Sequence, residues 1–193
     1  MAQSHTDLSD ADLVKAAQRD IDAFDALYHR YVDRIFRYCY ARTHNHADAE
    51  DLTGQVFVAA LDALSRYRER HTFAAWLFGI ARNTCAHHHR AQYAHPETSL
   101  DDDCPLTAID AQLALVANTP TPEQATIRHE LRECLRRALR MLSDDRREAL
   151  NLRFWGGLTA REAAHVMHRD AGAIKMLVWR GINDLRKRCL NDE

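Results

Sequence analysis

The stretch from 159 to 188, TAREAAHVMHRDAGAIKMLVWRGINDLRKR, decides how the C-terminal part of the chain is expected to fold. Thr159 and Glu162 have the spacing of a capping box, which predicts the start of a short helix. The polar run 168–170 then predicts a turn, and Asp170 is placed to cap a second, longer helix. A short capped helix, a three-residue turn and a longer helix together predict a helix-turn-helix unit.

The longer helix has two different faces. Turning each residue by 100° gathers small and apolar side chains on a buried face: Ala171, Ile174, Leu177, Val178, Gly181, Ile182 and Leu185. The other face is basic and also carries two large apolar side chains. Because the second helix of such a unit enters the major groove, we expect contacts with double-stranded DNA. The residues expected to make them are Arg161, Arg169, Gly172, Ala173, Lys175, Met176, Trp179 and Arg180.

The charge of the chain is divided unevenly along its length. The net charge is only −2, yet residues 131–190 hold 14 Lys/Arg against 7 Asp/Glu. Residues 96–130 hold 1 against 7, and residues 1–95 hold 11 against 12. Phosphate binding requires a local basic excess, which only the C-terminal block has. A helical hairpin with a solvated basic face is the alternative interpretation of that block.

A stretch rich in proline and acidic residues divides the chain. All four prolines fall between 96 and 122, together with the run Asp101-Asp102-Asp103, whereas both flanks lack proline and have helical periodicity. No segment alternates with the period of two that strands require. The sequence therefore predicts an all-α fold with two small helical domains, 1–95 and 131–193, joined by a flexible acidic linker at 96–130.

Four helices are expected before the linker: one starting near Ser9, then 23–42, 47–64 and 73–90. The third has a buried apolar stripe and an exposed side that carries mostly carboxylates, for which a solvated acidic face is the alternative interpretation. On the fourth, Phe73, Trp76 and Leu77 share a face expected to be core. A basic loop with an embedded aromatic residue, 65–72, joins the third helix to the fourth.

Three runs resemble segments of the extracytoplasmic-function (ECF) sigma factors of bacterial RNA polymerase. The stretch 142–154, LSDDRREALNLRF, with GLT at 157–159 and EAA at 162–164, resembles their region that binds the promoter −35 element. The runs DAEDLT at 48–53 and WLFGIARN at 76–83 resemble their polymerase-binding and −10-binding segments. The order and spacing of the runs also agree with the family, and together they are far more specific than any one alone.

The resemblance implies a role for each surface. The acidic side of the third helix is expected to bind core polymerase, through Asp48, Glu50, Asp51 and Gln55. The basic loop and the fourth helix are expected to hold the −10 element and nucleate its melting, through Arg66, Tyr67, Arg68, Arg82, Asn83, Ala86, His89 and Arg90. The implied partners are core RNA polymerase, promoter DNA and an anti-sigma factor, with no cofactor, no bound metal and no catalysis.

Some positions depart from the family pattern. Position 87, often aspartate in the family, is His87, and Met176 and Leu177 stand where a serine and an arginine are common. Trp179 replaces a frequent histidine. Met176 and Trp179 offer apolar contacts, such as to thymine methyl groups, and few hydrogen bonds. Packing of Trp179 on the other domain or on a partner protein is an equal alternative.

Other site types and functions find little support. Consecutive histidines such as 87–89 diverge by 100° on a helix, so no metal site is expected. The five scattered cysteines lack a CxxC spacing and are expected to be reduced thiols. No secretory signal or membrane span is visible, so a cytoplasmic location without membrane insertion is expected. A stand-alone regulator with a sensing or dimerising N-terminal domain is the main alternative function. A hydrolase or metalloenzyme lacks any supporting motif.

Overall fold

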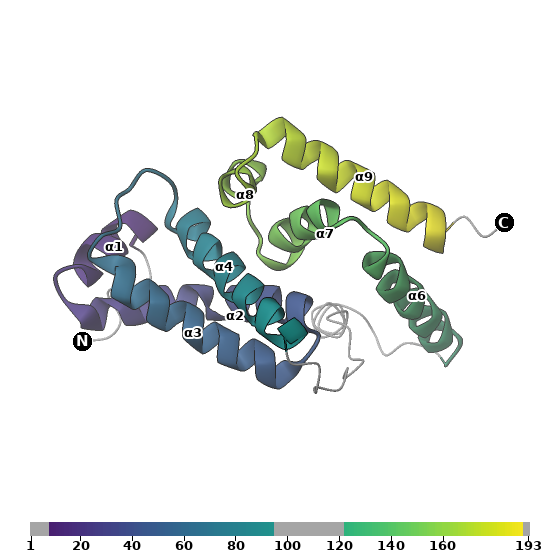
Figure 1. Ribbon diagram of the computed structural model, residues 1–193, viewed down its shortest axis with the longest axis horizontal. Helices are drawn as coiled ribbons and strands as arrows, with labels where there is room; N and C mark the ends of the chain where they lie inside the picture. Colours follow the sequence, from purple (N-terminus) through teal and green to yellow (C-terminus); the bar gives the residue numbers. More distant parts are fainter. Residues whose placement is uncertain (1–7, 95–121, 191–193) are drawn as a thin grey trace.

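The computed structural model describes residues 8–94 and 122–190 (Figure 1). Over these two ranges every regular element is a helix and none is a strand. The expected all-α fold is therefore confirmed. The purple-to-teal helices form the N-terminal half, and the green-to-yellow helices form the C-terminal half beside it.

The N-terminal half consists of α1 (Asp10–Ala17), a 3-10 turn η1 (Ile21–Ala23), α2 (Phe24–Thr43), α3 (His46–Leu64) and α4 (Phe73–Ala94). Ser9 caps α1 by accepting a hydrogen bond from the backbone N–H of Asp12. Asn45 caps α3 in the same way, directly after His44 has ended α2 in the left-handed conformation at φ 55°. These local signals place α2 and α3 antiparallel to each other, as Figure 1 shows.

The C-terminal half consists of α6 (Pro122–Arg140), α7 (Asp144–Leu150), one turn of π-helix η2 (Asn151–Trp155), α8 (Ala160–Met167) and α9 (Ala171–Cys189). Both hydrogen bonds of the predicted capping box between Thr159 and Glu162 are present at the start of α8. Asp170 accepts a hydrogen bond from Ala173 N at the start of α9. The predicted helix-turn-helix is thus formed by α8 and α9.

Helix α6 begins inside the stretch that the sequence assigns to the linker. Its first residue is Pro122, and proline is favoured at the first helical position because its missing N–H would have no partner there. The remainder of the expected linker, 96–121, lies outside the described residues. The boundaries at 95 and 131 stay a prediction.

The two halves pack against each other, which the sequence does not predict. Leu152 and Leu158 of the C-terminal half belong to the same buried cluster as Tyr38 and Phe78 of the N-terminal half. At this seam a Cβ on Gly156 would stand 2.8 Å from a ring carbon of Phe78 and 2.8 Å from the carbonyl oxygen of Leu152. Glycine therefore permits the close approach of η2 to α4.

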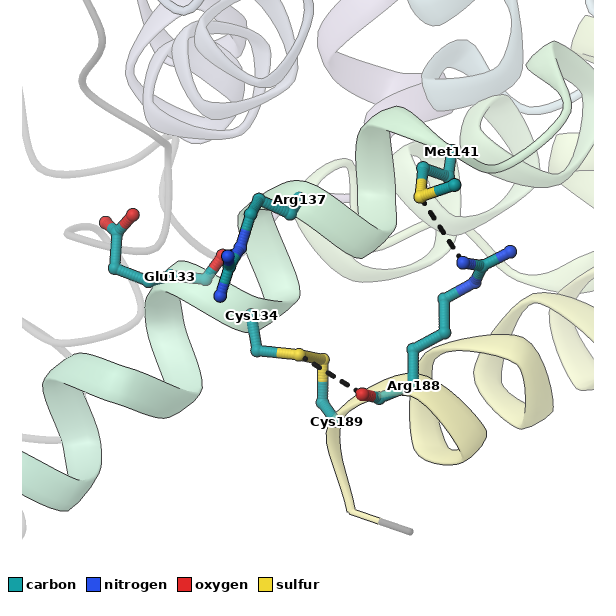
Figure 2. The surroundings of a disulfide bond; sticks show 6 residues. All are labelled: Glu133, Cys134, Arg137, Met141, Arg188 and Cys189. Carbon is teal, nitrogen blue, oxygen red and sulfur yellow. Dashed lines mark hydrogen bonds between the residues drawn. A yellow bond between two sulfur atoms is a disulfide. The ribbon is translucent and has the colours of Figure 1, made fainter. Parts of the chain in front are cut away.

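The expectation of reduced cysteines is wrong for one pair. A disulfide joins Cys134 of α6 to Cys189 at the end of α9 (Figure 2). Their Cα atoms lie 5.7 Å apart although 55 positions separate them in sequence, so no local spacing reveals the pair. Cys39 and Cys85 are free and buried, as expected of reduced thiols, whereas Cys104 lies outside the described residues.

Candidate nucleic-acid interface

The outer face of α9 exposes the side chains expected to meet DNA. Met176 and Trp179 are 48% and 61% exposed, and Lys175 and Arg180 beside them are also exposed. Large apolar side chains on a surface mark interaction sites when they cluster. Because its side chain is this exposed, Trp179 does not pack on the N-terminal half. The outer face of α9 thus combines two apolar side chains with cationic neighbours.

The start of α9 is open enough for a close approach. A Cβ on Gly172 would meet only the side-chain oxygen of Asp170, at 3.0 Å. Arg169, in the turn before α9, is exposed but pairs with Asp145 of α7 at 2.5 Å, while Arg161 on α8 is exposed. An exposed ion pair is worth at most about 1 kcal/mol, so Arg169 can exchange this carboxylate for a phosphate.

The acidic side of α3 is largely exposed. Glu50, Asp51 and Gln55 point to solvent and line one open surface with Gly54, Val58, Ala59 and Asp62. Asp48 lies farther round the helix, half-buried, with its carboxylate 3.5 Å from Nε2 of His88. The sequence prediction overlooked Val58, which is 63% exposed on this surface and places an apolar side chain among the carboxylates.

Five residues of α4 expected to bind the −10 element lie together. They line a hollow that α2 and α7 complete: Arg82, Asn83, Ala86, His89 and Arg90 from α4, with Arg42 and His44 from α2 and Asp144, Asp145, Arg147 and Glu148 from α7. The hollow therefore lies between the two halves of the molecule. In this arrangement α7 faces the part of α4 that the sequence assigns to DNA.

The loop residues behave differently from one another. Arg66 and Arg68 are exposed, but Tyr67 is only 7% exposed and donates a hydrogen bond from its hydroxyl to the carbonyl of His71. Its ring packs against Phe73 and Trp76. Tyr67 is therefore a core residue in this structure, in which a base cannot reach its ring. The loop lies roughly 15–25 Å along α4 from the hollow, because an α-helix rises 1.5 Å per residue.

A buried carboxylate joins the two halves. Glu148 on α7 is 5% exposed, accepts a hydrogen bond from the Tyr38 hydroxyl at 2.7 Å and forms an ion pair with Arg42. Nε of Arg82 on α4 lies 3.8 Å from the same carboxylate. Burial and the Glu148 charge raise the pKa of Tyr38 well above its ordinary value, so this hydroxyl stays protonated and donates. We call these four residues the Glu148 cluster.

A second set of contacts closes the seam. Arg34 of α2 donates hydrogen bonds to the carbonyls of Gly156 and Gly157, at 2.9 and 3.3 Å. At the start of α4, Thr72 donates to Glu162 of α8 at 2.8 Å. Farther along, Arg82 donates to the carbonyl of Val166 at 3.4 Å. Helix α8 of the helix-turn-helix is therefore held along α4.

Comparison with known proteins assigns both halves. The Sigma-70 region 2 family matches residues 27–94, and the Sigma-70 region 4 family matches residues 132–185. The chain is 30% identical to the ECF RNA polymerase sigma-E factor of Escherichia coli, over 90% of each chain. The chain belongs to the ECF sigma factors.

Other relatives agree with this sigma-factor assignment. The ECF RNA polymerase sigma factor BldN of Streptomyces coelicolor is 32% identical over 94% of this chain, which spans 66% of that longer protein. The fold is similar to that of the sigma factor RpoE of Bartonella quintana, solved with the anti-sigma factor NepR, with a TM-score of 0.61 and 22% identity over 88% and 98% of the two chains. A stand-alone regulator is not favoured, because both halves match sigma-factor regions.

Within the described residues, no helix of this sigma factor combines the length and apolar character that crossing a bilayer requires. The histidine run does not converge on a point: His87 and His89 are exposed, while His88 turns toward Asp48. This divergence agrees with the 100° step between consecutive residues on α4.

The sequence prediction overlooked the residues that hold the halves together. Arg34, Tyr38 and Arg42 follow one another at steps of four on α2, which places them on one face of the helix. That regular spacing of two arginines around a tyrosine was a usable signal. The position of Glu148 was not, because a single acidic residue on a short helix normally faces solvent.

Two partly buried histidines, His44 and His165, have lowered pKa values. Burial, and then His71 and His168, lower the pKa of His165, whose ring lies 3.4 Å from that of His71 across the seam. Burial also lowers the pKa of His44, as do three arginines near it: Arg140, Arg147 and Arg136. Both histidines are therefore held neutral in the folded protein more strongly than in the unfolded chain.

We expect the free energy of unfolding to fall as pH drops from 7 to 5.5. Below the ordinary histidine pKa of about 6.5 the unfolded chain binds protons that the folded protein excludes, so stability is full above that pH and decreases below it. Urea unfolding at several pH values measures the slope. His44→Asn, which suits the left-handed backbone there, should flatten the slope. A slope of the opposite sign in the wild type would contradict the prediction.

Proposed function

We propose that this sigma factor binds core RNA polymerase through the exposed acidic side of α3 and holds promoter DNA through α4 and α9. The observation that carries the proposal is the α9 face, where exposed Met176 and Trp179 stand among cations next to a capped α8. Helix α9 would enter the major groove at the −35 element, with Lys175 and Arg180 on phosphates. Residues 1–95 and 131–193 would then act as two promoter-binding units.

We propose that the −10 element is bound by the α4 residues that line the hollow, together with the exposed arginines of the loop. Arg82, Asn83 and Arg90 would hold single-stranded DNA by charge and hydrogen bonds, while Arg66 and Arg68 would contact the backbone nearby. The burial of Tyr67 supports leaving it out of the contact set. Its role is to fix the loop against Phe73 and Trp76.

The contact between the N-terminal and C-terminal halves limits which promoter elements can be bound at once. Promoter positions −10 and −35 lie about 25 base pairs apart, which is roughly 85 Å of B-form DNA. In the structure, however, α8 contacts α4 directly, and Arg82 donates to an α8 carbonyl. The two units would therefore have to separate before both elements are bound, which would break the Glu148 cluster together with the other contacts of the seam.

The partners follow from the same proposal. Core polymerase and promoter DNA are the binding partners, and an anti-sigma factor is a further one, because a similar fold was solved with such a protein. We propose that the protein acts by binding alone, without catalysis, and that it works in the cytoplasm beside the polymerase. Carboxylates such as Asp51 would form bidentate pairs with polymerase arginines.

Run-off transcription tests the proposed function. The full chain is combined with bacterial core polymerase on a fragmented genomic DNA library, and transcripts are mapped at their 5′ ends. We expect start sites that share a two-part upstream sequence and that are absent with core polymerase alone. Specific DNA binding without polymerase, accompanied by no new transcripts, would instead indicate a stand-alone regulator.

A further inference from the structure

The cysteines of the described residues fall into two classes. Cys39 and Cys85 are free and almost fully buried, with their sulfur atoms 3.8 Å apart. Cys134 and Cys189 are half-exposed and bonded to each other across α6 and α9 (Figure 2). The pair that is accessible from solvent is therefore the pair that is oxidised.

The disulfide lies where the C-terminal half has little buried contact. Of the 19 residues of α9, only Ile174 and Gly181 are buried, and both precede its last two turns. Within 129–140 of α6, Ala138 is the only buried residue. Elements with little buried area open most readily, so α6 and the end of α9 need another source of stability.

Two polar contacts lie near the end of α9 besides the disulfide. Arg146 of α7 forms an ion pair with Asp184, and Nη1 of Arg188 lies 3.3 Å from the sulfur of Met141, as Figure 2 shows. Both contacts are partly exposed and individually weak. The covalent bond closes a loop from 134 to 189 that contains α7, η2, α8 and nearly all of α9.

We propose that Cys134 and Cys189 form a reversible redox-modification site that controls how firmly α6 is held on the helix-turn-helix. The co-reactant is a low-molecular-weight disulfide. One cysteine thiolate attacks a sulfur of this disulfide and displaces one small thiol, forming a mixed disulfide. The second cysteine attacks the protein sulfur and releases the other small thiol. Two protein thiols thereby lose two electrons, one small disulfide becomes two thiols, and the two thiol protons pass to them.

Both cysteines are partly exposed, so the bond can be reached from solvent. Figure 2 shows the backbone carbonyl of Arg188 beside the disulfide, 3.4 Å from Sγ of Cys134, while the Arg188 side chain extends away toward Met141. Disulfides of cytosolic proteins are usually transient and redox-sensing, because glutathione and thioredoxin keep thiols reduced there. The cytosolic location rests on the proposed function, in which the protein binds core polymerase. We therefore expect the Cys134–Cys189 bond to form and to be reduced reversibly.

The test uses the full chain equilibrated in mixtures of reduced and oxidised glutathione. Free thiols are alkylated after unfolding and counted by mass spectrometry. We expect three free thiols in excess oxidised glutathione and five in excess reduced glutathione, with full interchange between them. Cys134→Ser cannot complete the exchange, so it should form no intramolecular bond and should keep any attached glutathione as a mixed disulfide on Cys189. The matched control Cys104→Ser should still lose two thiols on oxidation.

The oxidised protein should also be more stable. A disulfide across a loop of this size is expected to raise the Tm by about 5–15 °C. Amide hydrogen exchange of α6 and the end of α9 should be slower in the oxidised form, while α2 and α3 remain unchanged. In Cys134→Ser, the amide hydrogens of α6 and the end of α9 should exchange at the rate of the reduced wild type in both glutathione mixtures.

Three results would overturn the proposal. Five free thiols in oxidised glutathione would show that the bond does not form, and a bond that persists in excess reduced glutathione would show a permanent structural link. Equal exchange of α6 in both forms would remove its effect on the helix-turn-helix. None of these measurements uses polymerase or DNA, so failure here is distinguishable from failure of the proposed function.

Discussion

Glu148→Gln is expected to shift this sigma factor from the packed arrangement toward separated halves. Glutamine has nearly the same shape, so the change removes the charge without leaving a cavity. Arg42 would then lose its ion pair and Arg82 its nearby carboxylate, at a site where Glu148 is 5% exposed. Removing one partner of a buried pair costs about 3 kcal/mol at the lower end of the usual range. The lower end applies because both arginines are partly exposed.

This energy corresponds to a change of roughly 100-fold in the ratio of packed to separated molecules. Small-angle X-ray scattering measures the separation as a larger radius of gyration, and urea unfolding measures the lost stability. Asp145→Asn on the same helix is the matched control, because its ion pair with Arg169 is exposed and lies within the C-terminal half. Scattering curves that superimpose for wild type and Glu148→Gln would show that the cluster does not hold the halves.

Asp51→Arg is expected to remove most binding to core polymerase. Asp51 is exposed in the middle of the acidic side of α3, between Glu50 and Gln55 on the same open surface. If this surface meets arginines of polymerase, reversing one charge places like charges opposite each other, which costs several kcal/mol. A loss of affinity of about 100-fold or more follows from that cost.

A pull-down with core polymerase, followed by titration, measures this loss. Asp33→Arg changes an exposed aspartate on the neighbouring helix α2 by the same charge and serves as the control. Circular dichroism should show unchanged helicity in both variants, because neither side chain is buried. Wild-type affinity of Asp51→Arg would mean that polymerase docks elsewhere and that the acidic side of α3 is only a solvated face.

Much of the fold follows from short-range signals in the sequence. The Thr159 capping box, the turn before Asp170 and the starts of α1 and α9 each depend on residues within four positions of one another. Helical periodicity then separates buried from exposed faces, so Asp51 and Met176 are correctly expected on the surface. Such contacts form wherever the segment is placed, because the helix itself brings these residues together.

The sequence prediction is less complete for aromatic and charged residues whose environment depends on another helix. Tyr67 resembles a base-stacking residue in a basic loop, yet Phe73 and Trp76 enclose its ring. Val58 interrupts an acidic surface without disturbing any pattern. In each case the side chain is compatible with both surroundings, and only the packing of neighbouring elements selects one.

The sequence by itself determined the all-α class, the helix-turn-helix and the three candidate surfaces, since each rests on local spacing, local charge or a contiguous run of family-like residues. Only the tertiary structure decided that Glu148 joins α7 to α2 and α4, and that Cys134 meets Cys189. Glu148 is 106 positions from Arg42, and the cysteines are 55 positions apart. Such pairs depend on how whole helices dock, and docking follows from the summed burial of many side chains, which no local pattern encodes.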